Sequence, residues 1–339
     1  MPSVSVVIPS YNRAGLIGDT LANLLRQTRV PNEIIVVDDG STDGSCDIIN
    51  RFPSPVQLIK QANLGPGAAR NTGIAATGGK YLILQDSDDL YSLNKVEAQV
   101  EVAERTGADI VFSPWAKATI EGVRLQLENR VLQQALPPLR RPLLHWWFRS
   151  WSTVFQSLLI RASFLRKVGG YRTDLRLGED GELFVRCLLQ NPRVAFAPEA
   201  LTLYRLHQEN KLTENSGRAS GQRIADWVRC LHLSSDHAHD ANVNLDFWTR
   251  SLFAREAAKQ IPYLDAVPDA PAADRNFLLA TSRKFPRSWI GLVDAWVRMQ
   301  EKIRMRMTGS RWPESFQSGP ITSAQVKLVE ELGFSVTRS

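Results

Sequence analysis

Cysteine is scarce in this chain of 339 residues, which contains only Cys46, Cys187 and Cys230. An odd number of cysteines without the spacing of a metal site predicts neither a disulfide framework nor a zinc centre. Free thiols are typical of a reducing compartment, because disulfides form mainly in oxidising ones. We therefore expect a cytoplasmic protein.

Long apolar runs are absent as well. No stretch of the sequence approaches the roughly 18 uninterrupted apolar residues that identify a transmembrane helix. The first residues lead directly into a strand pattern, without the basic and apolar regions that begin a signal peptide. These absences agree with a cytoplasmic location and leave open a peripheral position on the inner face of the cell membrane.

Two phosphate-binding signatures are also missing. No G-x-G-x-x-G follows the first apolar run, and no G-x-x-x-x-G-K-[ST] occurs in the chain. A dehydrogenase would be expected to show the first motif and a P-loop NTPase the second. Both classes are therefore disfavoured.

The composition that remains is ordinary for a globular protein, with 43% hydrophobic and 22% charged residues. The net charge of +6 admits anionic partners such as nucleotides, nucleic acid or an anionic membrane surface. No basic stripe with interleaved aromatic residues accompanies this charge, so we expect no nucleic-acid partner. The length predicts one large domain with an appendage, or two domains.

The first ninety residues alternate between apolar strands and helices. Strands are predicted at residues 4–8, 33–39, 56–59 and 81–84, and a helix is predicted at 16–25. The β-α-β order implies parallel strands with right-handed crossovers. The pattern predicts an α/β fold that binds a nucleotide.

The rest of the chain is less regular. Further strands are predicted at residues 108–112, 194–196 and 201–207, whereas the weakly patterned residues 113–145 are expected to form a loop or an insertion. After residue 210 the composition changes to polar segments with alanine and tryptophan, which predict a helical appendage.

Three carboxylates, Asp86, Asp88 and Asp89, follow the apolar run 81–84 at once, with Ser87 among them. Buried strands of a parallel sheet carry their chemistry at the carboxyl end. Acids this close repel one another unless a cation lies between them, and hard oxygen ligands favour Mg²⁺ or Mn²⁺. The structural alternative is a solvated acidic turn, or an Asp that caps a helix beginning near Leu93.

A second acid pair, Glu179 and Asp180, opens a predicted helix. Acids at this position also compensate the helix dipole, so the pair has a purely structural alternative. His207 ends the predicted strand 201–207 and is a candidate ligand, although a lone histidine is usually an ordinary surface or core residue.

Two aromatic segments have alternative interpretations. Residues 145–151 combine aromatic and basic side chains, as in a core, a membrane-facing patch or an acceptor platform, and the core interpretation is favoured. Residues 296–307 form a basic, partly amphipathic segment, which fits a helix on an anionic membrane or a helix packed on the domain.

Six motifs resemble those of the family 2 glycosyltransferases with a GT-A fold, and they occur in the same order over residues 3–210. The motifs are Val7-Ile-Pro-Ser-Tyr-Asn-Arg13, Val36-Val-Asp-Asp-Gly-Ser-Thr-Asp43, Asn63-Leu-Gly-Pro-Gly-Ala-Ala-Arg-Asn-Thr-Gly73, Asp86-Ser-Asp-Asp89, Gly178-Glu-Asp180 and Tyr204-Arg-Leu-His207. The resemblance implies a mostly parallel, twisted sheet flanked by helices. It places a GT-A catalytic domain at residues 1–210 and a helical, membrane- or partner-associating region at 211–339.

The resemblance also implies roles for individual residues. Tyr11 would stack on the donor base, Asp39 would bind the base edge, and Arg70 would lie near the diphosphate or the base. Asp86, Asp88 and Asp89 would form the region that meets the ribose and a divalent metal, Ser87 among them would bind substrate, and Asp180 would be the catalytic base. The remaining substrate-binding residues are Pro9, Asn12, Arg13, Asn63, Gly65 and Glu179, and the metal ligands are Asp88, Asp89 and His207. Gly181 departs from the family, where an aromatic or larger residue often follows the acid pair.

An inverting transfer accounts for these residue types, because a single displacement needs one base and a group that stabilises the departing diphosphate. A retaining route would need a carboxylate nucleophile, for which the sequence offers no candidate. The predicted enzyme moves a sugar from a nucleotide-sugar, with UDP as the commonest nucleotide, to a saccharide or lipid-linked acceptor in polysaccharide, cell-envelope or glycolipid synthesis. The alternatives are a sugar-1-phosphate nucleotidyltransferase and a non-catalytic nucleotide-sugar-binding module.

Overall fold

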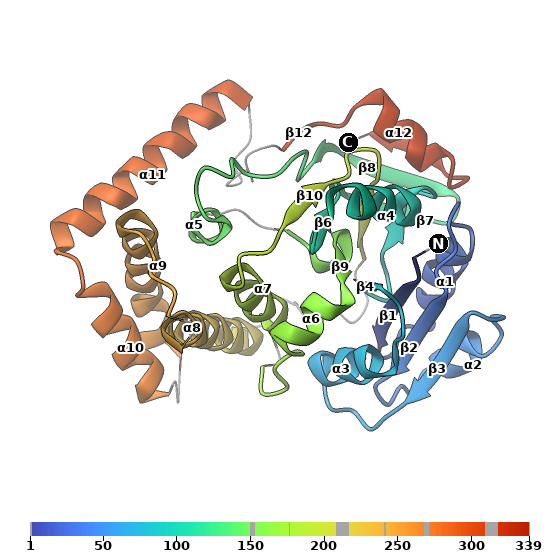
Figure 1. Cartoon of the computed structure of the whole chain (residues 1–339), viewed down its shortest axis with the longest axis horizontal. Helices are drawn as coiled ribbons and strands as arrows, with labels where there is room; N and C mark the ends of the chain where they lie inside the picture. Colours follow the sequence, from blue (N-terminus) through green and yellow to red (C-terminus); the bar gives the residue numbers. More distant parts are fainter. Residues whose placement is uncertain are drawn as a thin grey trace.

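The computed structural model places two sheets in the centre of the molecule and a group of helices at one end (Figure 1). The residues that it describes are 2–149, 153–175, 177–207, 217–240, 242–267, 271–308 and 318–338.

The larger sheet has seven strands in the order β10-β6-β9-β4-β1-β2-β3; β9 is antiparallel to both of its neighbours, and every other pair is parallel. The four strands predicted in the first ninety residues are confirmed as the adjacent strands β4-β1-β2-β3, with β3 at the edge. The strands are β1 (Val4–Ser10), β2 (Glu33–Asp38), β3 (Val56–Lys60), β4 (Tyr81–Leu84), β6 (Ile110–Phe112), β9 (Leu159–Arg161) and β10 (Val194–Phe196).

Both faces of this sheet are covered, because successive side chains of a strand point to opposite faces. In β1, Val6 belongs to a core cluster with Leu21 of α1, and its neighbour Val7 belongs to another with Phe184 of α7. The covering helices are α1 (Ile17–Leu25), α2 (Ser45–Ile49), α3 (Pro66–Ala76), α4 (Lys95–Thr106), α6 (Ala162–Val168) and α7 (Glu179–Leu189).

A second sheet contains residues 113–145, which were predicted as a loop or an insertion, so the loop alternative was wrong. Its order is β12-β8-β7-β11-β5, with β13 also paired to β8, and the hairpin β7–β8 lies within residues 113–145. Leu125 and Leu127 are buried and alternate with outward polar residues, which is the pattern of a half-buried strand. The strands are β5 (Leu90–Tyr91), β7 (Trp115–Glu121), β8 (Arg124–Val131), β11 (Thr202–Leu206), β12 (Gly319–Pro320) and β13 (Ser335–Arg338).

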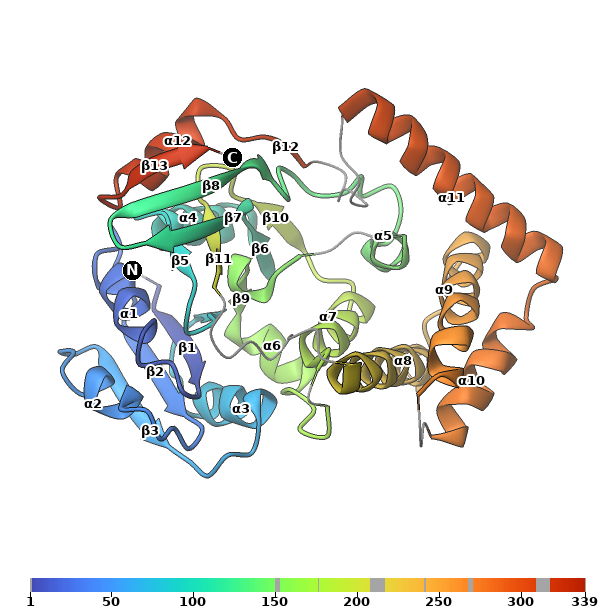
Figure 2. The same ribbon diagram turned by 180° about the vertical axis from the view of Figure 1, so that it is seen from behind.

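Four long helices follow residue 210, in agreement with the predicted helical texture. They are α8 (Gly217–Asp240), α9 (Phe247–Asp265), α10 (Ala272–Ser282) and α11 (Arg287–Thr308), and they pack beside α7 and α5 (Leu143–Phe148) (Figure 2). Leu231, Phe253 and Val293 join the same core cluster as Phe184 of α7. The helices are therefore tied to the sheet domain by a shared apolar core.

The last described segment is not helical throughout, which corrects the prediction for the end of the chain. β12 and β13 flank α12 (Ser323–Glu330) and both pair with β8. Arg26 of α1 donates a hydrogen bond of 3.0 Å to the carbonyl of Leu332. Residues 318–338 thus complete the second sheet.

The aromatic segment 145–151, described as far as residue 149, packs into the core, with Trp147 partly exposed at the edge of that core. Trp146 and Phe148 are buried, and the Phe148 ring lies 4.7 Å from the ring of Phe253 in α9. The short 3₁₀ helix η1 (Phe155–Ser157) follows it. Among the described residues, no helix combines the length and the apolarity that crossing a bilayer requires.

Candidate active site

The carboxyl ends of β1, β2 and β4 meet at one edge of the larger sheet, because the three strands are parallel neighbours. The loop after β1 is tied to the loop after β2: Asn12 donates from its backbone to Ser41, and its side-chain oxygen accepts from Thr42, both at 2.9 Å. Asn12 has a φ of 51°, a left-handed conformation that asparagine tolerates. Tyr11, on the same loop, is 46% exposed and free to contact a ligand.

Asp39 holds the loop that precedes α3. Its carboxylate accepts hydrogen bonds from the backbone of Leu64 (2.9 Å) and Gly65 (2.8 Å) and from the side chain of Gln61 (2.7 Å). Asp39 is buried, so these contacts compensate for the loss of water around its charge. The predicted neighbours Asn63 and Gly65 are thereby brought to the β2 loop.

Arg70 is the centre of the site's charge network. It donates to Glu179 at 2.9 Å and to Asp86 at 2.8 Å, and Asp180 lies 3.9 Å away. Its guanidinium carbon lies 5.2 Å from the centre of the Tyr171 ring. Burial alone would lower the pKa of Arg70, but the charges of Asp180, Asp86 and Glu179 raise that pKa well above its ordinary value. This one cation therefore joins the acids after β4 to those opening α7.

Close packing brings α3 to this position. A Cβ on Gly67 would lie 2.8 Å from the carbonyl oxygen of Arg172, so a larger residue would push α3 away from the segment before α7. The first residue of α3 is Pro66, whose fixed φ suits a helix start.

Two acids beside Arg70 bind protons more tightly than usual. Burial, with the neighbouring charge of Asp180, raises the pKa of Glu179 to about 7 against the opposing effect of Arg70. Burial also raises the pKa of Asp86 to about 6, again against the effect of Arg70. The site thus holds more carboxylates than its one buried arginine neutralises.

We expect Glu179→Gln to flatten the decline of stability between pH 5 and pH 7. In that interval the folded protein keeps a proton on Glu179, with a pKa of about 7, whereas the unfolded chain releases it near its ordinary value of 4.5. The free energy of unfolding of the wild type therefore falls as pH rises, by a few kcal/mol at most, since one pKa unit corresponds to about 1.4 kcal/mol. Urea unfolding of both proteins at pH 5, 6 and 7 measures the difference in slope. Parallel curves would contradict the raised pKa.

The acidic group after β4 is gathered closely enough to hold a cation. Asp86, Asp88 and Asp89 each offer a carboxylate oxygen, and these oxygens lie within 4.8 Å of one another. Asp88 lies 2.9 Å from His207 and 3.6 Å from the guanidinium of Arg13. The structure thus brings two of the three predicted ligands, Asp88 and His207, into direct contact.

Asp89 has a different position from its neighbours. It is 1% exposed, one oxygen accepts from the Arg205 backbone at 2.8 Å, and the other accepts from Gln156. Burial and the charges of Asp88 and Asp86 raise the pKa of Asp89 well above its ordinary value. Protein donors therefore already engage both oxygens of this predicted ligand. The helix-cap alternative for the acidic group is wrong, because α4 begins two residues beyond Leu93 and has Asn94 as its N-cap.

Hard oxygen ligands with one adjacent imidazole fit Mg²⁺ or Mn²⁺. The Nδ1 atom of His207 is buried and has no hydrogen-bond partner among the described residues, so this ring is also available to a ligand. The residues present therefore fit a divalent cation held by Asp88 with Asp86 and His207.

Asp180 lies at the first turn of α7, where it was predicted. Its side chain is 37% exposed, and its Oδ1 atom is buried without a donor in hydrogen-bond geometry among the described residues. Burial, with the charge of Asp180, raises the pKa of the neighbouring Tyr171 hydroxyl well above its ordinary value. Asp180 thus has one buried oxygen without a hydrogen-bond donor and a side chain that is otherwise partly open to solvent.

Gly181 leaves space that two tryptophans border. A Cβ at this position would lie 3.5 Å from the ring of Trp147 and 3.7 Å from the ring of Trp227. Both rings are partly exposed, and they come from α5 and α8. Where the motif that the sequence resembles often has an aromatic or larger residue, this chain has Gly181, and two tryptophans from distant parts of the chain lie beside it.

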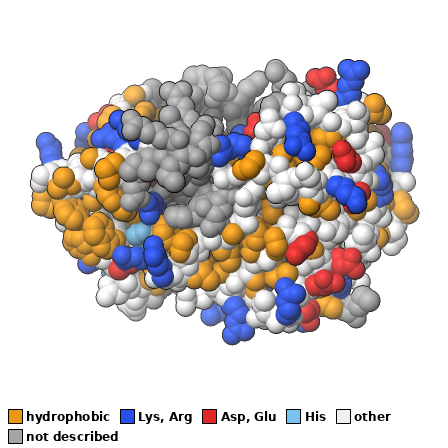
Figure 3. Space-filling view, turned by 90° about the horizontal axis from the view of Figure 1, so that it is seen from above, with side chains coloured by type: hydrophobic (Ala, Val, Ile, Leu, Met, Phe, Trp, Pro, Cys, Tyr) orange, Lys and Arg blue, Asp and Glu red, His pale blue; other side chains and the backbone are white. Residues whose placement is uncertain are grey.

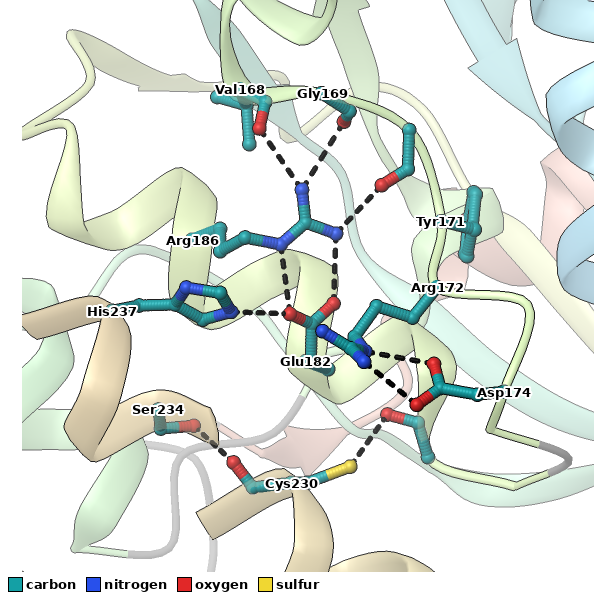
Figure 4. A network of polar contacts seen from close by, with 12 residues as sticks. Val168, Gly169, Tyr171, Arg172, Asp174, Glu182, Arg186, Cys230, Ser234 and His237 are labelled. Atoms are coloured by element: carbon teal, nitrogen blue, oxygen red, sulfur yellow. Dashed lines mark hydrogen bonds and ion pairs between the residues drawn. The ribbon is translucent and has the colours of Figure 1, made fainter. Parts of the chain in front are cut away.

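A charge cluster that the sequence did not indicate fixes α7 (Figure 4). Arg186 binds the carboxylate of Glu182 at 2.7 and 2.8 Å and donates to the carbonyls of Val168, Gly169 and Gly170. His237 of α8 lies 2.8 Å from the same carboxylate. Burial raises the pKa of Glu182, but His237 and Arg186 outweigh it and hold that pKa below its usual value. The cluster anchors the helix that begins with Glu179 and Asp180.

Comparison with known proteins gives one family and one fold. Residues 5–169 match the model of glycosyl transferase family 2. The chain is 34% identical to the uncharacterized glycosyltransferase EpsJ of Bacillus subtilis over 229 residues, which are 63% of this chain and 64% of that protein. It is 30% identical to the succinoglycan biosynthesis protein ExoO of Rhizobium meliloti, covering 61% of this chain and 62% of that one. The chain thus spans a little under two thirds of the length of these relatives.

The structural comparison confirms the predicted fold. Residues 1–349 of TarS from S. aureus, crystallised with UDP-GlcNAc, superpose with a TM-score of 0.53 and 16% identity, over 90% of this chain and 92% of that one. The likeness supports a GT-A type architecture for the mostly parallel sheet and its covering helices.

Proposed function

Because residues 5–169 match the model of glycosyl transferase family 2, we propose that this chain is an inverting glycosyltransferase of that family. It moves a sugar from a nucleotide-diphospho-sugar to an acceptor hydroxyl. The observation that carries the proposal is the position of Asp180, which has an unsatisfied oxygen and is linked through Arg70 to the acidic group after β4. A base and a site for the diphosphate are thus parts of one network.

The donor would bind across the loops after β1, β2 and β4. The exposed ring of Tyr11 suits stacking on the base, and the loop held by Asp39 forms the other wall. UDP is the nucleotide we favour, since it is the commonest in the family. Asp88, with Asp86 and His207, would hold Mn²⁺ or Mg²⁺, which when bound neutralises negative charge on the leaving diphosphate.

The reaction requires the protein to accept one proton. Asp180 takes the proton of the acceptor hydroxyl as that oxygen attacks the anomeric carbon, and the nucleoside diphosphate leaves from the opposite face. The guanidinium of Arg70 lies 3.9 Å from the Asp180 carboxylate and is held in place by its other acids. The cluster around Glu182 fixes α7, the helix that carries Asp180. The alternative of a nucleotidyltransferase lacks a Gly-rich, basic loop after β1, and a module that only binds donor would not need Asp180.

The acceptor would lie beside the rings of Trp147 and Trp227, next to Asp180. Aromatic faces offer an apolar surface to a saccharide, while its hydroxyls stay available for hydrogen bonds. ExoO is named for succinoglycan biosynthesis, which favours polysaccharide synthesis among the pathways considered. A saccharide or a lipid-linked saccharide is the proposed acceptor.

A donor screen tests this function without an acceptor. The protein is incubated with UDP-, GDP- and dTDP-sugars in the presence of Mn²⁺, and release of the nucleoside diphosphate is measured. We expect hydrolysis of one donor class, UDP-sugars first, which EDTA abolishes. Release of pyrophosphate from a sugar-1-phosphate and UTP would instead support the nucleotidyltransferase, and binding without any turnover would support the module.

We expect Asp88→Ala to remove the effect of Mn²⁺ on UDP binding. The substitution deletes the carboxylate that contacts His207, and loss of such a group lowers metal affinity by at least about tenfold. Calorimetric titration of UDP with and without Mn²⁺ measures the change, and Asp47→Ala, an exposed acid on α2, is the control. Unchanged metal dependence in Asp88→Ala would contradict the metal assignment.

The proposal includes contact with the membrane surface through α11. Leu292, Trp296 and Met299 lie at helical spacing on this helix and are 63%, 36% and 50% exposed. Exposed apolar residues beside basic ones are typical of helices that rest on anionic membranes. In the predicted segment 296–307, the side chains of residues 300, 301 and 303–307 lie outside the described part of the structure.

We expect the double variant Leu292→Glu with Met299→Glu to co-sediment several-fold less with phosphatidylglycerol vesicles. Each substitution replaces an exposed apolar side chain by a charge that the lipid surface repels. The matched control changes Val123 and Leu139, which are 73% and 59% exposed on other parts of the chain, to Glu. Equal loss in both double variants would assign the effect to net charge alone.

A further inference from the structure

A cavity of about 560 Å³ lies between α5, α8, α9 and α10, away from the carboxyl ends of the central strands. Its walls are mainly apolar and include Leu144, Phe148, Phe253 and Ala254. The volume is within the range of about 300 to 1,000 Å³ that small-molecule sites occupy. Part of its apolar lining is exposed, as at Phe247 with 46%, and exposed apolar surface of this kind marks ligand-binding grooves and membrane sites.

The charged residues that line this cavity are all basic. Arg250 and Lys284 are both exposed, and His239 is the third titratable residue of the lining, which contains no Asp or Glu. Within the described part of the chain, no ion pair involves Arg250 or Lys284. Of the nearby acids, Asp240 lies 3.5 Å from His239, Asp246 lies 3.5 Å from Arg141, and Asp294 binds Arg255 and Arg298. The mouth of an apolar cavity is thus left with uncompensated positive charge.

The same cavity is continuous with an exposed aromatic surface. Phe247 lines the cavity, is 46% exposed, and has ring contacts of 5.9 Å with Trp248 and 5.4 Å with Trp289. Trp248, 40% exposed, in turn lies 6.2 Å from Trp296 of α11. Figure 3 shows apolar side chains gathered beside Lys and Arg at the end of the molecule formed by these helices. Tryptophan beside basic residues is typical of a membrane interface.

We propose that this cavity binds a hydrocarbon chain of an anionic bilayer lipid, with the lipid phosphate on Arg250 and Lys284. The apolar walls suit the chain, the unpaired cations suit the phosphate, and the aromatic surface places the mouth where a bilayer would meet it. The inference rests on the proposed membrane contact of α11 and not on glycosyl transfer. The inference specifies which class of lipid the protein would bind at the membrane, namely anionic lipids.

Monomeric lipid separates this site from general adhesion to a membrane. The probe is dioctanoyl phosphatidylglycerol below its micellar concentration, titrated against the full chain while tryptophan fluorescence and the melting temperature are followed. We expect saturable binding that Arg250→Glu with Lys284→Glu weakens by about 30-fold, since each basic residue near an anionic lipid contributes about fivefold. Arg283→Glu with Arg287→Glu, an equal change of charge outside the lining, should bind as the wild type does.

A second variant tests the cavity without a change of charge. Ser235→Phe places a ring in the space from α8, where Ser235 is partly exposed, and should weaken the same probe by at least about tenfold, as lost apolar burial implies. Donor hydrolysis measured on every variant should stay unchanged. Absence of hydrolysis in all of them would reject the proposed function and leave the lipid site standing.

Three results would overturn the lipid site. Equal affinity for dioctanoyl phosphatidylcholine would show that Arg250 and Lys284 do not bind the lipid phosphate. Unchanged binding in both Ser235→Phe and the Arg250/Lys284 variant would show that the lipid does not bind in this cavity. Loss of monomer binding in Leu292→Glu with Met299→Glu, to the same extent as loss of vesicle binding, would assign the lipid to α11 instead.

Discussion

Asp180→Asn is expected to lose at least about 100-fold in glycosyl transfer while it keeps the fold and the affinity for UDP and Mn²⁺. A general base contributes typically about 10²- to 10⁴-fold to the rate, because it removes the acceptor proton in the transition state. The amide is nearly the same size as the carboxylate but binds no proton at neutral pH. Transfer is measured with a donor from the hydrolysis screen and an acceptor saccharide, and UDP affinity is measured by calorimetry.

The structural alternative for this acid predicts a different result. If Asp180 only compensates the dipole of α7, its loss costs about 0.3 to 1 kcal/mol of stability and leaves the rate unchanged. Asp174→Asn is the matched control, because Asp174 is an exposed acid in the same segment whose partner is Arg172 at 2.7 Å. A fully active Asp180→Asn would return the acid pair to a structural role.

The site residues that could be predicted from the sequence are those that lie next to a recognisable apolar strand or helix. The strand Tyr81–Leu84 is apolar at every position and buried throughout, so its end could be placed, and the acids after it were found. Asp180 was placed because an amphipathic helix begins at its neighbour Glu179. In both cases a local pattern marks the position of the side chain.

Contacts between distant residues were not predictable in this way. Arg70 and Glu179 are separated by 109 positions, and His237 and Glu182 by 55. No periodicity links such pairs, and an Arg in a small-residue helix has many available partners. The raised pKa of Glu179 depends on burial that arises only once α3 packs against α7.

Two errors of secondary structure have a common physical reason. β8 is polar on one face, and β12 and β13 are short strands that pair with it, so their stability comes from tertiary pairing more than from apolar content. The alternation at Leu125 and Leu127 was present in the sequence and would have identified β8. The short strands at the chain end carry no comparable signal.

The structure adds a second role for Arg70 to the predicted one. The family resemblance places this residue near the diphosphate or the base, and its guanidinium also donates to Asp86 and Glu179 from a residue that is 5% exposed. A buried cation between two acids holds the donor side and the base side of the site together. Its removal should therefore affect stability before it affects chemistry.

Arg70→Gln is expected to lower the free energy of unfolding at pH 8 by about 3 to 5 kcal/mol, because removing one partner of a buried ion pair leaves uncompensated charge in the interior. Urea unfolding measures this change. Arg172→Gln is the control, since Arg172 is paired with Asp174 at the surface and an exposed pair contributes about 0 to 1 kcal/mol.

The pH dependence of Arg70→Gln distinguishes lost charge compensation from lost packing. Glu179 already has a pKa of about 7 with Arg70 beside it, and Arg70 lowers that pKa, so its loss moves the value further up. Arg70 also lowers the pKa of Asp86, which is about 6, so its loss raises that value too. In the folded variant Glu179 and Asp86 are then both mainly protonated at pH 5.5, and neither former partner of Arg70 is left there as an unpaired charge. The destabilisation relative to the wild type should accordingly be smaller at pH 5.5 than at pH 8, because stability from a raised carboxyl pKa is present at low pH and lost as pH rises through the folded value. A loss of equal size at both pH values would show that Arg70 acts through the packing of its side chain against Tyr171, and the account of this site as a charge network centred on Arg70 would fail.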